Sequence, residues 1–386
     1  MLEATPVRYP SLDVLRGIAI LGTLATNIWI FTDPAGLVGY VTGMWHPDDA
    51  WSWVERVLQQ LAQGKFLGLL TIMFGIGLAI QQRSAQRRGE RWPGAYPWRA
   101  TLLFVDGVVH YLLVAEFDVL MGYAVTGVVV AFVLATEERH RRRWLVIAAT
   151  IHIVLLTALT AALLLSADDS GQSAPLQPNP YADGTWWDLV VFRIENAGVF
   201  RFEPAFILAL SVALFLVGAR LFAAGVLAAD GRALRRRLMI VGFAVALPID
   251  FALGTIGGDA GVVFARYGTA PIVSLGILGL VAEFYVRRDR VGAVGRRLGE
   301  VGRTALSCYV LQNVVASTIC YGWGFGLAAT VSDEARVPVT IGVYLLVCAV
   351  IVTAAHLWLR RFDRGPVEWL WNASVVRLTK TPQRVR

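Results

Sequence analysis

Charged side chains are scarce in this sequence. Of its 386 residues only 16% are charged, whereas 56% are hydrophobic and the mean hydropathy is +0.58. Soluble domains carry about 25% charged residues. This much apolar surface cannot be hidden in one aqueous core, so the composition excludes a soluble globular protein and indicates one that lives in the lipid bilayer.

The sequence is also poor in residues and motifs for metal and nucleotide chemistry. Its three cysteines, Cys308, Cys320 and Cys348, fall inside apolar segments at no metal-ligand or disulfide spacing. It contains no phosphate-binding glycine loop, nucleophile elbow or zinc-protease motif. We therefore expect no metal and no nucleotide-driven pumping by this chain.

Lysine is the rarest charge: only Lys65 and Lys380 accompany the many arginines, and the net charge is +7. The arginines form short runs between apolar stretches, which is a topology signal and not a nucleic-acid-binding surface, so we expect no nucleic-acid partner. The runs are concentrated in alternate connections. Because cytoplasmic loops are enriched in Arg and Lys, we predict a multi-pass protein of the bacterial inner membrane with both termini cytoplasmic.

About ten apolar stretches have the length of a bilayer-spanning helix, and lipid forces each to satisfy its backbone hydrogen bonds internally. The sequence thus predicts an all-α, polytopic membrane helix bundle, with stretches 99–115 and 117–136 forming a tight hairpin around Glu116. Residues 168–202 should form the longest outer loop, and the tail after Arg360 an interfacial helix. The ten stretches are 11–32, 61–82, 99–115, 117–136, 144–166, 203–225, 237–257, 268–287, 303–325 and 338–359.

Polar residues inside the first stretch are candidates for a site, because ionisable groups in a membrane are costly. Asp13 and Arg16 are three residues apart and can pair, and Arg16 shares a helical face with Ile20, Thr23 and Asn27. Either Asp13 and Arg16 form a structural ion pair, or Arg16 faces a cavity and binds an anionic group such as a phosphate.

The third stretch carries a candidate base. Asp106 and His110 are at i and i+4, so the carboxylate can accept a hydrogen bond from the imidazole and leave the other nitrogen free. Asp118 and Tyr123 follow across the hairpin. His110 lies eleven residues from Arg99, or roughly 16 Å at 1.5 Å per residue, which puts it near mid-membrane. A packing role for His110 is the alternative.

Two further residues complete the candidate set. Lys65 is the only lysine near a span and could extend to the outer interface to meet a substrate carboxylate or sugar. Gln312, with Asn313, could line the same cavity or bridge helices.

Several motifs resemble the YeiB-like family of bacterial inner-membrane proteins, and together they cover nearly the whole chain. The family's domain of unknown function is matched by the carboxyl half. The motifs are Ser11 to Gly22 with Asn27, Gly64 to Phe66, Phe74 to Ala79, Gly107 to His110, Asp118 to Leu120, Tyr123-Ala124, Gly302 to Leu306, and Arg364 to Trp371. The chain departs from the family pattern at Asp106, where an apolar residue is usual, and at Glu116-Phe117, where Gly commonly precedes the Asp.

The first stretch is also similar to that of the wider transmembrane acyltransferase group, which moves acyl groups from cytoplasmic acyl-CoA to acceptors, commonly sugars, across the membrane. This resemblance implies acyl-CoA as donor, His110 as base with Asp106 or Asp118 behind it, and a cell-envelope glycan or lipid as acceptor. It divides the chain into an acyltransferase-like half, 1–225, and a family domain, 226–386. A proton-coupled carrier of a small metabolite or lipid is the alternative function. The sequence does not decide whether the protein forms a homodimer.

Overall fold

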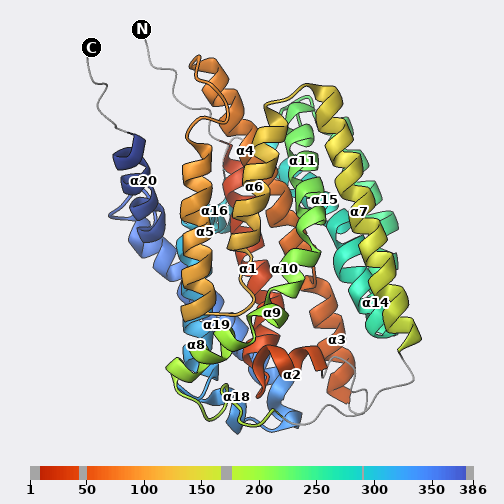
Figure 1. Cartoon of the computed structure of the whole chain (residues 1–386), viewed down its shortest axis with the longest axis vertical. Coiled ribbons are helices and arrows are strands. Elements are labelled where there is room, and N and C mark those ends of the chain that lie inside the picture. The colour runs from red at the N-terminus through yellow and green to blue at the C-terminus, as the bar shows by residue number, and fades with distance from the viewer. Residues whose placement is uncertain (1–8, 43–49, 167–175, 289–290, 380–386) are drawn as a thin grey trace.

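The computed structural model describes residues 9–42, 50–166, 176–288 and 291–379, and in these ranges the chain is helical with no strand. Figure 1 shows the helices gathered into one bundle. The helices are α1 (Pro10–Phe31), α2 (Gly36–Thr42), α3 (Ala50–Ala62), α4 (Lys65–Arg87), α5 (Tyr96–Leu113), α6 (Leu120–Leu134), α7 (Glu138–Leu165), α8 (Trp186–Glu195), α9 (Ala197–Phe200), α10 (Phe202–Phe206), α11 (Leu208–Ala223), α12 (Arg232–Met239), the π-helix η2 (Ile240–Ala246), α13 (Leu247–Ile256), α14 (Gly258–Phe264), the π-helix η3 (Ala265–Thr269), α15 (Ala270–Val286), α16 (Ala293–Arg303), α17 (Ala305–Cys320), α18 (Leu327–Thr330), α19 (Asp333–Leu359) and α20 (Pro366–Thr379).

The predicted all-α membrane bundle is confirmed. Within the described ranges, seven helical stretches are long and apolar enough to cross a bilayer. The shorter apolar helices α6 and α17 coincide with two further expected spans, and α5 occupies a third. The count of ten itself stays a prediction. The seven stretches are Pro10–Phe31, Trp51–Arg87, Glu138–Leu165, Ala197–Ala223, Arg232–Ile256, Gly258–Val286 and Asp333–Leu359.

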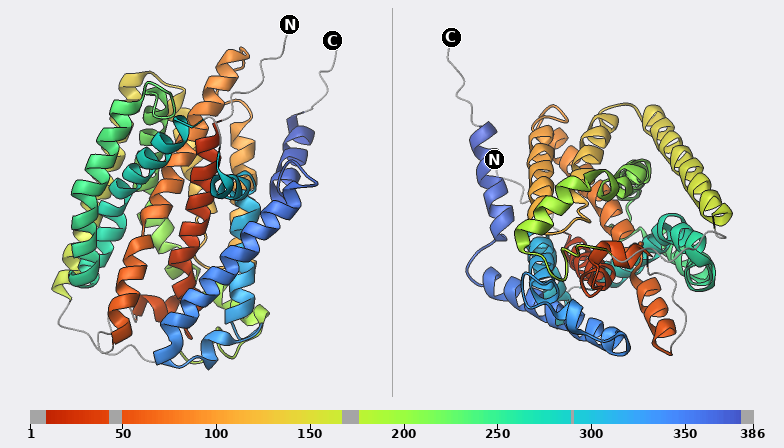
Figure 2. Two further views of the ribbon diagram at one scale, coloured as in Figure 1. Left: turned by 180° about the vertical axis from the view of Figure 1, so that it is seen from behind. Right: turned by 60° about the horizontal axis from the view of Figure 1, so that its bottom comes forward.

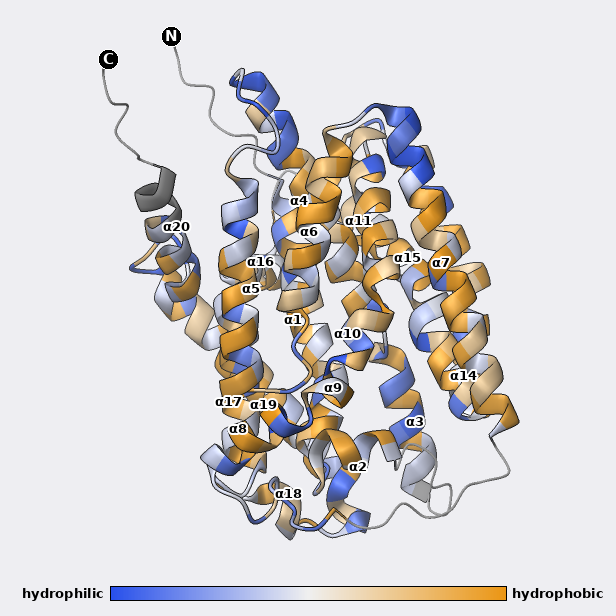
Figure 3. Cartoon of the chain, viewed as in Figure 1, coloured by the Kyte–Doolittle hydropathy of each residue, from blue (hydrophilic) through white to orange (hydrophobic). Residues whose placement is uncertain are grey.

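The bundle is organised around α1, which packs against α4, α16, α17 and α19 (Figures 1 and 2). The arginine-rich α4–α5 connection and the start of α7 lie at one end, which we call the Arg-rich end. Helices α2, α8 and α18 lie at the opposite end. Figure 3 shows hydrophobic residues along the length of the helices between the two ends, as lipid requires.

Glycines set the closest helix crossings. A Cβ atom at Gly17 of α1 would lie 2.0 Å from the carbonyl oxygen of Leu298 in α16. A Cβ at Gly75 of α4 would likewise lie 2.0 Å from the carbonyl oxygen of Phe215 in α11. Small residues let transmembrane backbones approach one another, so these crossings depend on glycine.

Three expectations about local structure can be compared with the described residues. The hairpin around Glu116 is present as α5 and α6, joined by residues 114–119. The tail after Arg360 forms α20, as predicted. The prediction of an outer loop over 168–202 was only partly correct, because the chain is helical from Trp186 onward. A capping box between Thr185 and Asp188 starts α8 there. The Thr185 hydrogen bonds lower the pKa of Asp188.

Candidate functional site

The break between α5 and α6 brings a histidine and an aspartate together inside the bundle. His110 Nδ1 lies 3.1 Å from Asp118 Oδ1, and both side chains are buried. The two atoms are close but not aligned as a hydrogen bond, so this is a close approach and not a formed bond. Asn313 Nδ2 donates to His110 Nε2 at 3.0 Å. Because an amide NH2 only donates, this bond assigns the ring proton to Nδ1, facing Asp118.

Asp118, not Asp106, is the acidic neighbour of His110. The i, i+4 spacing predicts that Asp106 accepts from the imidazole, and this is wrong: its carboxylate accepts from the indole N–H of Trp371 in α20. The α5–α6 turn instead folds back over Gly107, where a Cβ would lie 3.0 Å from Asp118 Oδ2 and 2.6 Å from the Met121 nitrogen. Glycine at this position therefore lets the turn reach the histidine.

Two arginines, Arg193 and Arg201, hold this turn. Arg193 of α8 pairs with Glu116 at 3.2 Å and donates to the carbonyl oxygens of Leu112 at 3.0 Å and Val114 at 3.1 Å. Arg201, between α9 and α10, donates to the carbonyl oxygens of Glu116 and Asp118. Carbonyls left open by the helix break are thus satisfied by guanidinium groups. No local pattern marked either arginine.

Tyr181 completes the support of the turn. Its hydroxyl donates to Glu116 at 2.8 Å, and the side chain is fully buried. Burial, and secondarily the nearby Glu116 carboxylate, raise the pKa of Tyr181 well above its usual value. The tyrosine therefore stays a neutral hydrogen-bond donor, and the turn that carries Asp118 is fixed from the side of α8.

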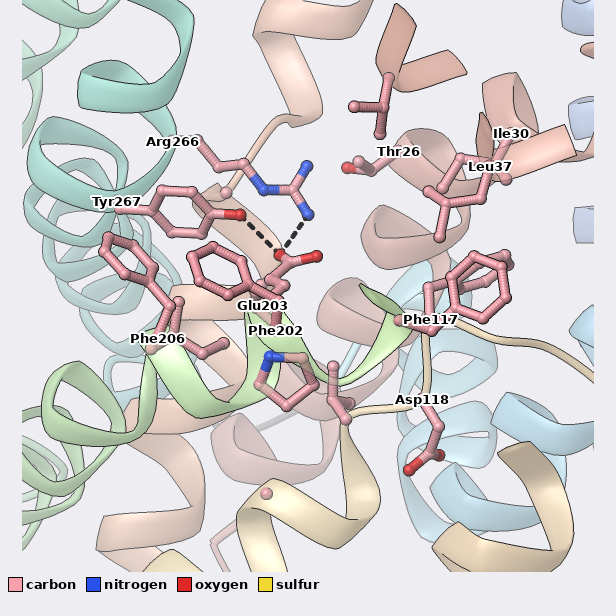
Figure 4. Close-up of a pocket in the computed structure, with 18 of the residues that line it drawn as sticks. Thr26, Ile30, Leu37, Phe117, Asp118, Phe202, Glu203, Phe206, Arg266 and Tyr267 are labelled. Carbon is pink, nitrogen blue, oxygen red and sulfur yellow. Dashed lines mark hydrogen bonds and ion pairs between the residues drawn. The ribbon is translucent and has the colours of Figure 1, made fainter. Parts of the chain in front are cut away.

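A cavity of about 750 Å³, which we call the main cavity, opens beside Asp118 in the half of the bundle that contains α2. Helices α1, α2, α6 and α9 to α11, the α5–α6 turn and η3 contribute to its wall. The predicted residues Asn27, Asp118 and Tyr123 all line it. Most of its lining residues are apolar, among them Ile30, Leu37 and Phe206, which Figure 4 shows beside polar residues such as Thr26.

One ionic cluster interrupts the apolar wall of the main cavity. Arg266 pairs with Glu203 at 2.8 Å, and the Tyr267 hydroxyl donates to the same carboxylate at 2.8 Å (Figure 4). The Nε atom of Arg266 is buried without a hydrogen-bond partner. The sequence does not reveal this cluster, because the two members of the ion pair lie 63 residues apart.

A second cavity, of about 400 Å³, lies toward the Arg-rich end, and we call it the arginine cavity. Arg16, Arg99 and Arg303 line it together with Glu368 and Trp371 of α20. Arg16 is only loosely paired with Asp13, with 3.8 Å between Nη1 and Oδ1. The predicted Asp13–Arg16 pair is therefore present, and Arg16 also faces a cavity, so the two interpretations of this pair are compatible.

The two cavities meet at the same two residues, since Val119 and Tyr309 line both. The Tyr309 ring lies 4.9 Å from the His110 ring. The predicted polar face of α1 follows both spaces, with Arg16 and Ile20 in the arginine cavity and Thr23 and Asn27 in the main cavity. His110 lines neither cavity and is 2% exposed, whereas Asp118, although 0% exposed, belongs to the wall of the main cavity.

Besides His110, the predicted site residues Asp13, Asp106, Lys65 and Gln312 line neither cavity. Lys65 does not extend to an interface: it is 2% exposed, and its Nζ lies 2.5 Å from Asp250 Oδ2. Burial next to a carboxylate replaces the water that the ammonium group would otherwise seek. Gln312 is fully buried next to Asn313 on α17, and no hydrogen bond to its side chain is seen among the described residues.

No metal site is apparent in the described part of the chain, where no three His, Cys, Asp or Glu side chains converge. The polar groups of the cavity walls include three arginines in the arginine cavity, and Asp118, the Glu203–Arg266 pair and neutral hydrogen-bonding groups in the main cavity. Such an arrangement can bind an anion at the Arg-rich end and accept a proton at Asp118.

Comparison with known proteins gives relatives along nearly the whole chain. Residues 221–377 match the family described as protein of unknown function DUF418. The chain is 28% identical to the uncharacterized protein YxaH of Bacillus subtilis (strain 168), over 96% of this chain and 94% of that protein. It is 27% identical to the uncharacterized protein YeiB of Escherichia coli (strain K12), over 96% and 97% of the two chains. No solved structure matches significantly. These matches confirm the predicted resemblance: the chain is similar to YeiB-like proteins over nearly its whole length and carries a DUF418 match in its carboxyl half.

Proposed function

We propose that this protein is a transmembrane acyltransferase that moves an acyl group from acyl-CoA to a hydroxyl or amine acceptor such as an envelope sugar or lipid. One observation carries the proposal. An arginine-lined cavity and a larger, mostly apolar cavity border the same two residues, Val119 and Tyr309, beside the buried Asp118–His110 pair. A donor and an acceptor held in the two cavities would meet there.

The donor would bind in the arginine cavity. Arg16, Arg99 and Arg303 face a space that contains one carboxylate, that of Glu368, so the local charge favours an anion. Guanidinium groups bind phosphate oxygens in a two-pronged geometry. The CoA phosphates would therefore lie at the Arg-rich end, with the acyl-bearing arm extended along α1 toward the main cavity.

The positive-inside bias supports an orientation for this scheme. Cytoplasmic connections are rich in arginine, which assigns the Arg-rich end and both termini to the cytoplasm, where acyl-CoA is available. The main cavity then lies in the outer half of a bacterial inner membrane. Whether the bundle works alone or as a homodimer does not affect the scheme.

The acceptor would be activated by Asp118 and His110 acting together. An acceptor hydroxyl or amine in the main cavity gives its proton to the Asp118 carboxylate, and the His110 Nδ1–H stabilises the charge of that carboxylate beforehand. The acceptor atom attacks the thioester carbonyl, and the carbon–sulfur bond breaks as the tetrahedral intermediate collapses. The thiolate of CoA takes up the proton. Asn27 is positioned on the cavity wall to donate to the carbonyl oxygen.

The proposal is tested by incubating purified protein with labelled acetyl-CoA and cell-envelope extract, and measuring free CoA and labelled product. Asp118→Asn and His110→Ala should lower the rate by about 10²- to 10⁴-fold, the usual contribution of general base catalysis. The matched control is His152→Ala, since His152 is a buried histidine of α7 that lines neither cavity and whose Nε2 lies 2.9 Å from the Tyr267 carbonyl oxygen. An unchanged rate in folded Asp118→Asn would refute the scheme.

The donor site has its own test. Arg16→Ala and Arg99→Ala should raise KM for acetyl-CoA with a smaller effect on kcat, because they remove binding contacts remote from the reacting atoms. The control is Arg361→Ala, an exposed arginine at the same end that lines neither cavity. Equal KM values in Arg16→Ala and Arg361→Ala would contradict the assignment of the CoA site.

Proton-coupled transport of a small metabolite or lipid is the second candidate. It is favoured by the same pair of cavities, which lie in opposite halves of the bundle and are parted by the side chains they share, as alternating access requires. Uptake into proteoliposomes driven by a pH gradient, without acyl-CoA, would support transport over acyl transfer.

A further inference from the structure

The wall of the main cavity includes side chains that also lie on the outer surface of the bundle. Val199 of α9 and Phe202 of α10 line the cavity and are 73% and 60% exposed. Both belong to the stretch Ala197–Ala223, which is apolar and long enough to span a membrane. A residue that is both lining and exposed marks an opening. The cavity therefore has one opening beside Val41 of α2, which lines it and is 55% exposed, and another at the side of the bundle between the short helices α9 and α10.

This opening suits hydrocarbon better than a hydrated sugar. Gly198, between Val199 and the start of α9, lines the same cavity, and a Cβ built on it meets nothing within 4 Å. The opening therefore has an apolar rim, with open space next to Gly198. A water-soluble acceptor would have to lose its hydration there without receiving hydrogen bonds in return.

Deeper in the cavity, polar groups are available for a headgroup. Thr26 and Asn27 face the cavity, and no hydrogen bond from either side chain is seen within the described ranges. Arg266 uses one terminal nitrogen for Glu203, while its Nε lacks a partner. The Glu203–Arg266 pair neutralises itself. These groups offer donors and acceptors without a net charge, which matches a neutral headgroup rich in hydroxyls.

Resting on the acyltransferase function proposed above, we infer that the acceptor is a membrane lipid with a neutral, hydroxyl-bearing headgroup. The lipid reaches the main cavity sideways between Val199 and Phe202. Its headgroup lies among Thr26, Asn27 and Arg266, with a hydroxyl at Asp118, and its chain remains at the apolar rim in contact with the bilayer. A cavity of about 750 Å³ has room for a headgroup and the first part of a chain.

Occupancy can be tested without any acyl transfer. The full chain is placed in phosphatidylcholine nanodiscs that contain a diacylglycerol with a diazirine on an acyl carbon close to the glycerol. After illumination, crosslinked peptides are mapped by mass spectrometry. We expect crosslinks to the buried lining residues Tyr123 and Phe206, in addition to crosslinks on the outward face of α7 at Ile153 and Val154, which any annular lipid can reach.

Two substitutions distinguish the cavity from the outer surface. Gly198→Trp should close the opening and abolish the crosslinks at Tyr123 and Phe206, while those on α7 remain. Gly342→Trp is the matched control, because Gly342 of α19 also has nothing within 4 Å of a built Cβ and does not line the cavity. Val199→Trp repeats the test at the rim should Gly198→Trp fold poorly.

The outcomes separate this inference from the function on which it rests. Crosslinks confined to α7 in the wild type, or interior crosslinks that persist in both rim variants, would overturn lipid occupancy whatever the enzymatic activity. With labelled acetyl-CoA, a labelled product that partitions into the organic phase supports a lipid acceptor, and a water-soluble labelled product overturns it. Failure to consume acetyl-CoA, with interior crosslinks intact, counts against acyl transfer alone.

Discussion

The buried pair Lys65–Asp250 gives the most exacting test of how this bundle is stabilised. Lys65 begins α4 and Asp250 lies in α13, and their side chains are 3% and 0% exposed. The ammonium nitrogen is 2.5 Å from Asp250 Oδ2 and 2.5 Å from the Gln60 carbonyl oxygen. Asp250 Oδ1 accepts from the Thr269 hydroxyl at 2.9 Å. Each charge therefore has a partner and a share of hydrogen bonds.

Lys65→Met removes the positive charge and leaves Asp250 ionised without a counter-charge in a dry site. Breaking a buried ion pair in this way costs about 3–5 kcal/mol. At roughly 2–4 °C per kcal/mol for a large domain, Tm should fall on the order of 10 °C. The double variant Lys65→Met/Asp250→Leu should recover most of this loss, because replacing both charges with apolar groups is often neutral.

Thermal unfolding of each variant in the same detergent measures the effect. The comparison pair is Arg88–Glu90, which is also close, at 2.7 Å, but 57% and 54% exposed. Solvent-exposed pairs contribute little, so Arg88→Ala should leave Tm unchanged. The reasoning is refuted if Lys65→Met melts with the wild type, or if the double variant is less stable than both single variants.

Three further changes test particular contacts. Gly75→Val should destabilise the α4–α11 crossing by several degrees in Tm, whereas Gly342→Val, at a position with open space, should not; equal melting would exclude a close crossing. Arg235→Met should lower Tm, but by less than Lys65→Met: this fully buried guanidinium pairs with Glu283 at 2.7 Å and donates to carbonyl oxygens, yet Glu283 keeps Arg287 at 2.6 Å, and wild-type melting would contradict these contacts. Glu368→Gln should weaken the docking of α20, since its carboxylate accepts from the Leu306 amide at 2.8 Å; proteolysis of α20 no faster than in wild type would count against this.

The fold could be predicted from the sequence to the extent that lipid dictates it. The length and apolarity of a stretch such as 144–166 are enough to predict a helix. The observed helix α7 (Glu138–Leu165) covers nearly the same residues. Helix α20 was predicted from Trp369 and Trp371 beside basic residues. Segment 237–257 was predicted as one span, and Arg232–Ile256 is one helical stretch long enough to cross a membrane. The π-helix η2 within it was not predicted, because hydropathy carries no signal for a change in helix type.

The candidate site was predictable only along single helices. The face of α1 that carries Arg16 and Asn27 was found because three turns of one helix fix it. The partner of His110 was not predicted correctly. Asp106 is one helical turn away from His110, but its carboxylate accepts a hydrogen bond from Trp371, which lies 265 residues further along the chain. Arg201 was missed for the same reason, since its carbonyl partners exist only once the α5–α6 turn has formed.

The buried charges of this bundle fall into two kinds, and the difference between them indicates which pair does chemistry. Apolar burial drives helix association weakly in lipid, so pairs such as Lys65–Asp250 and Arg193–Glu116 select one arrangement of helices. Both are held by several hydrogen bonds and lie outside the cavities. The Asp118–His110 pair differs, because its facing atoms lack aligned hydrogen bonds and Asp118 borders open space. A pair kept incomplete beside a cavity is poorly suited to stabilising the fold and well suited to exchanging a proton with a bound molecule.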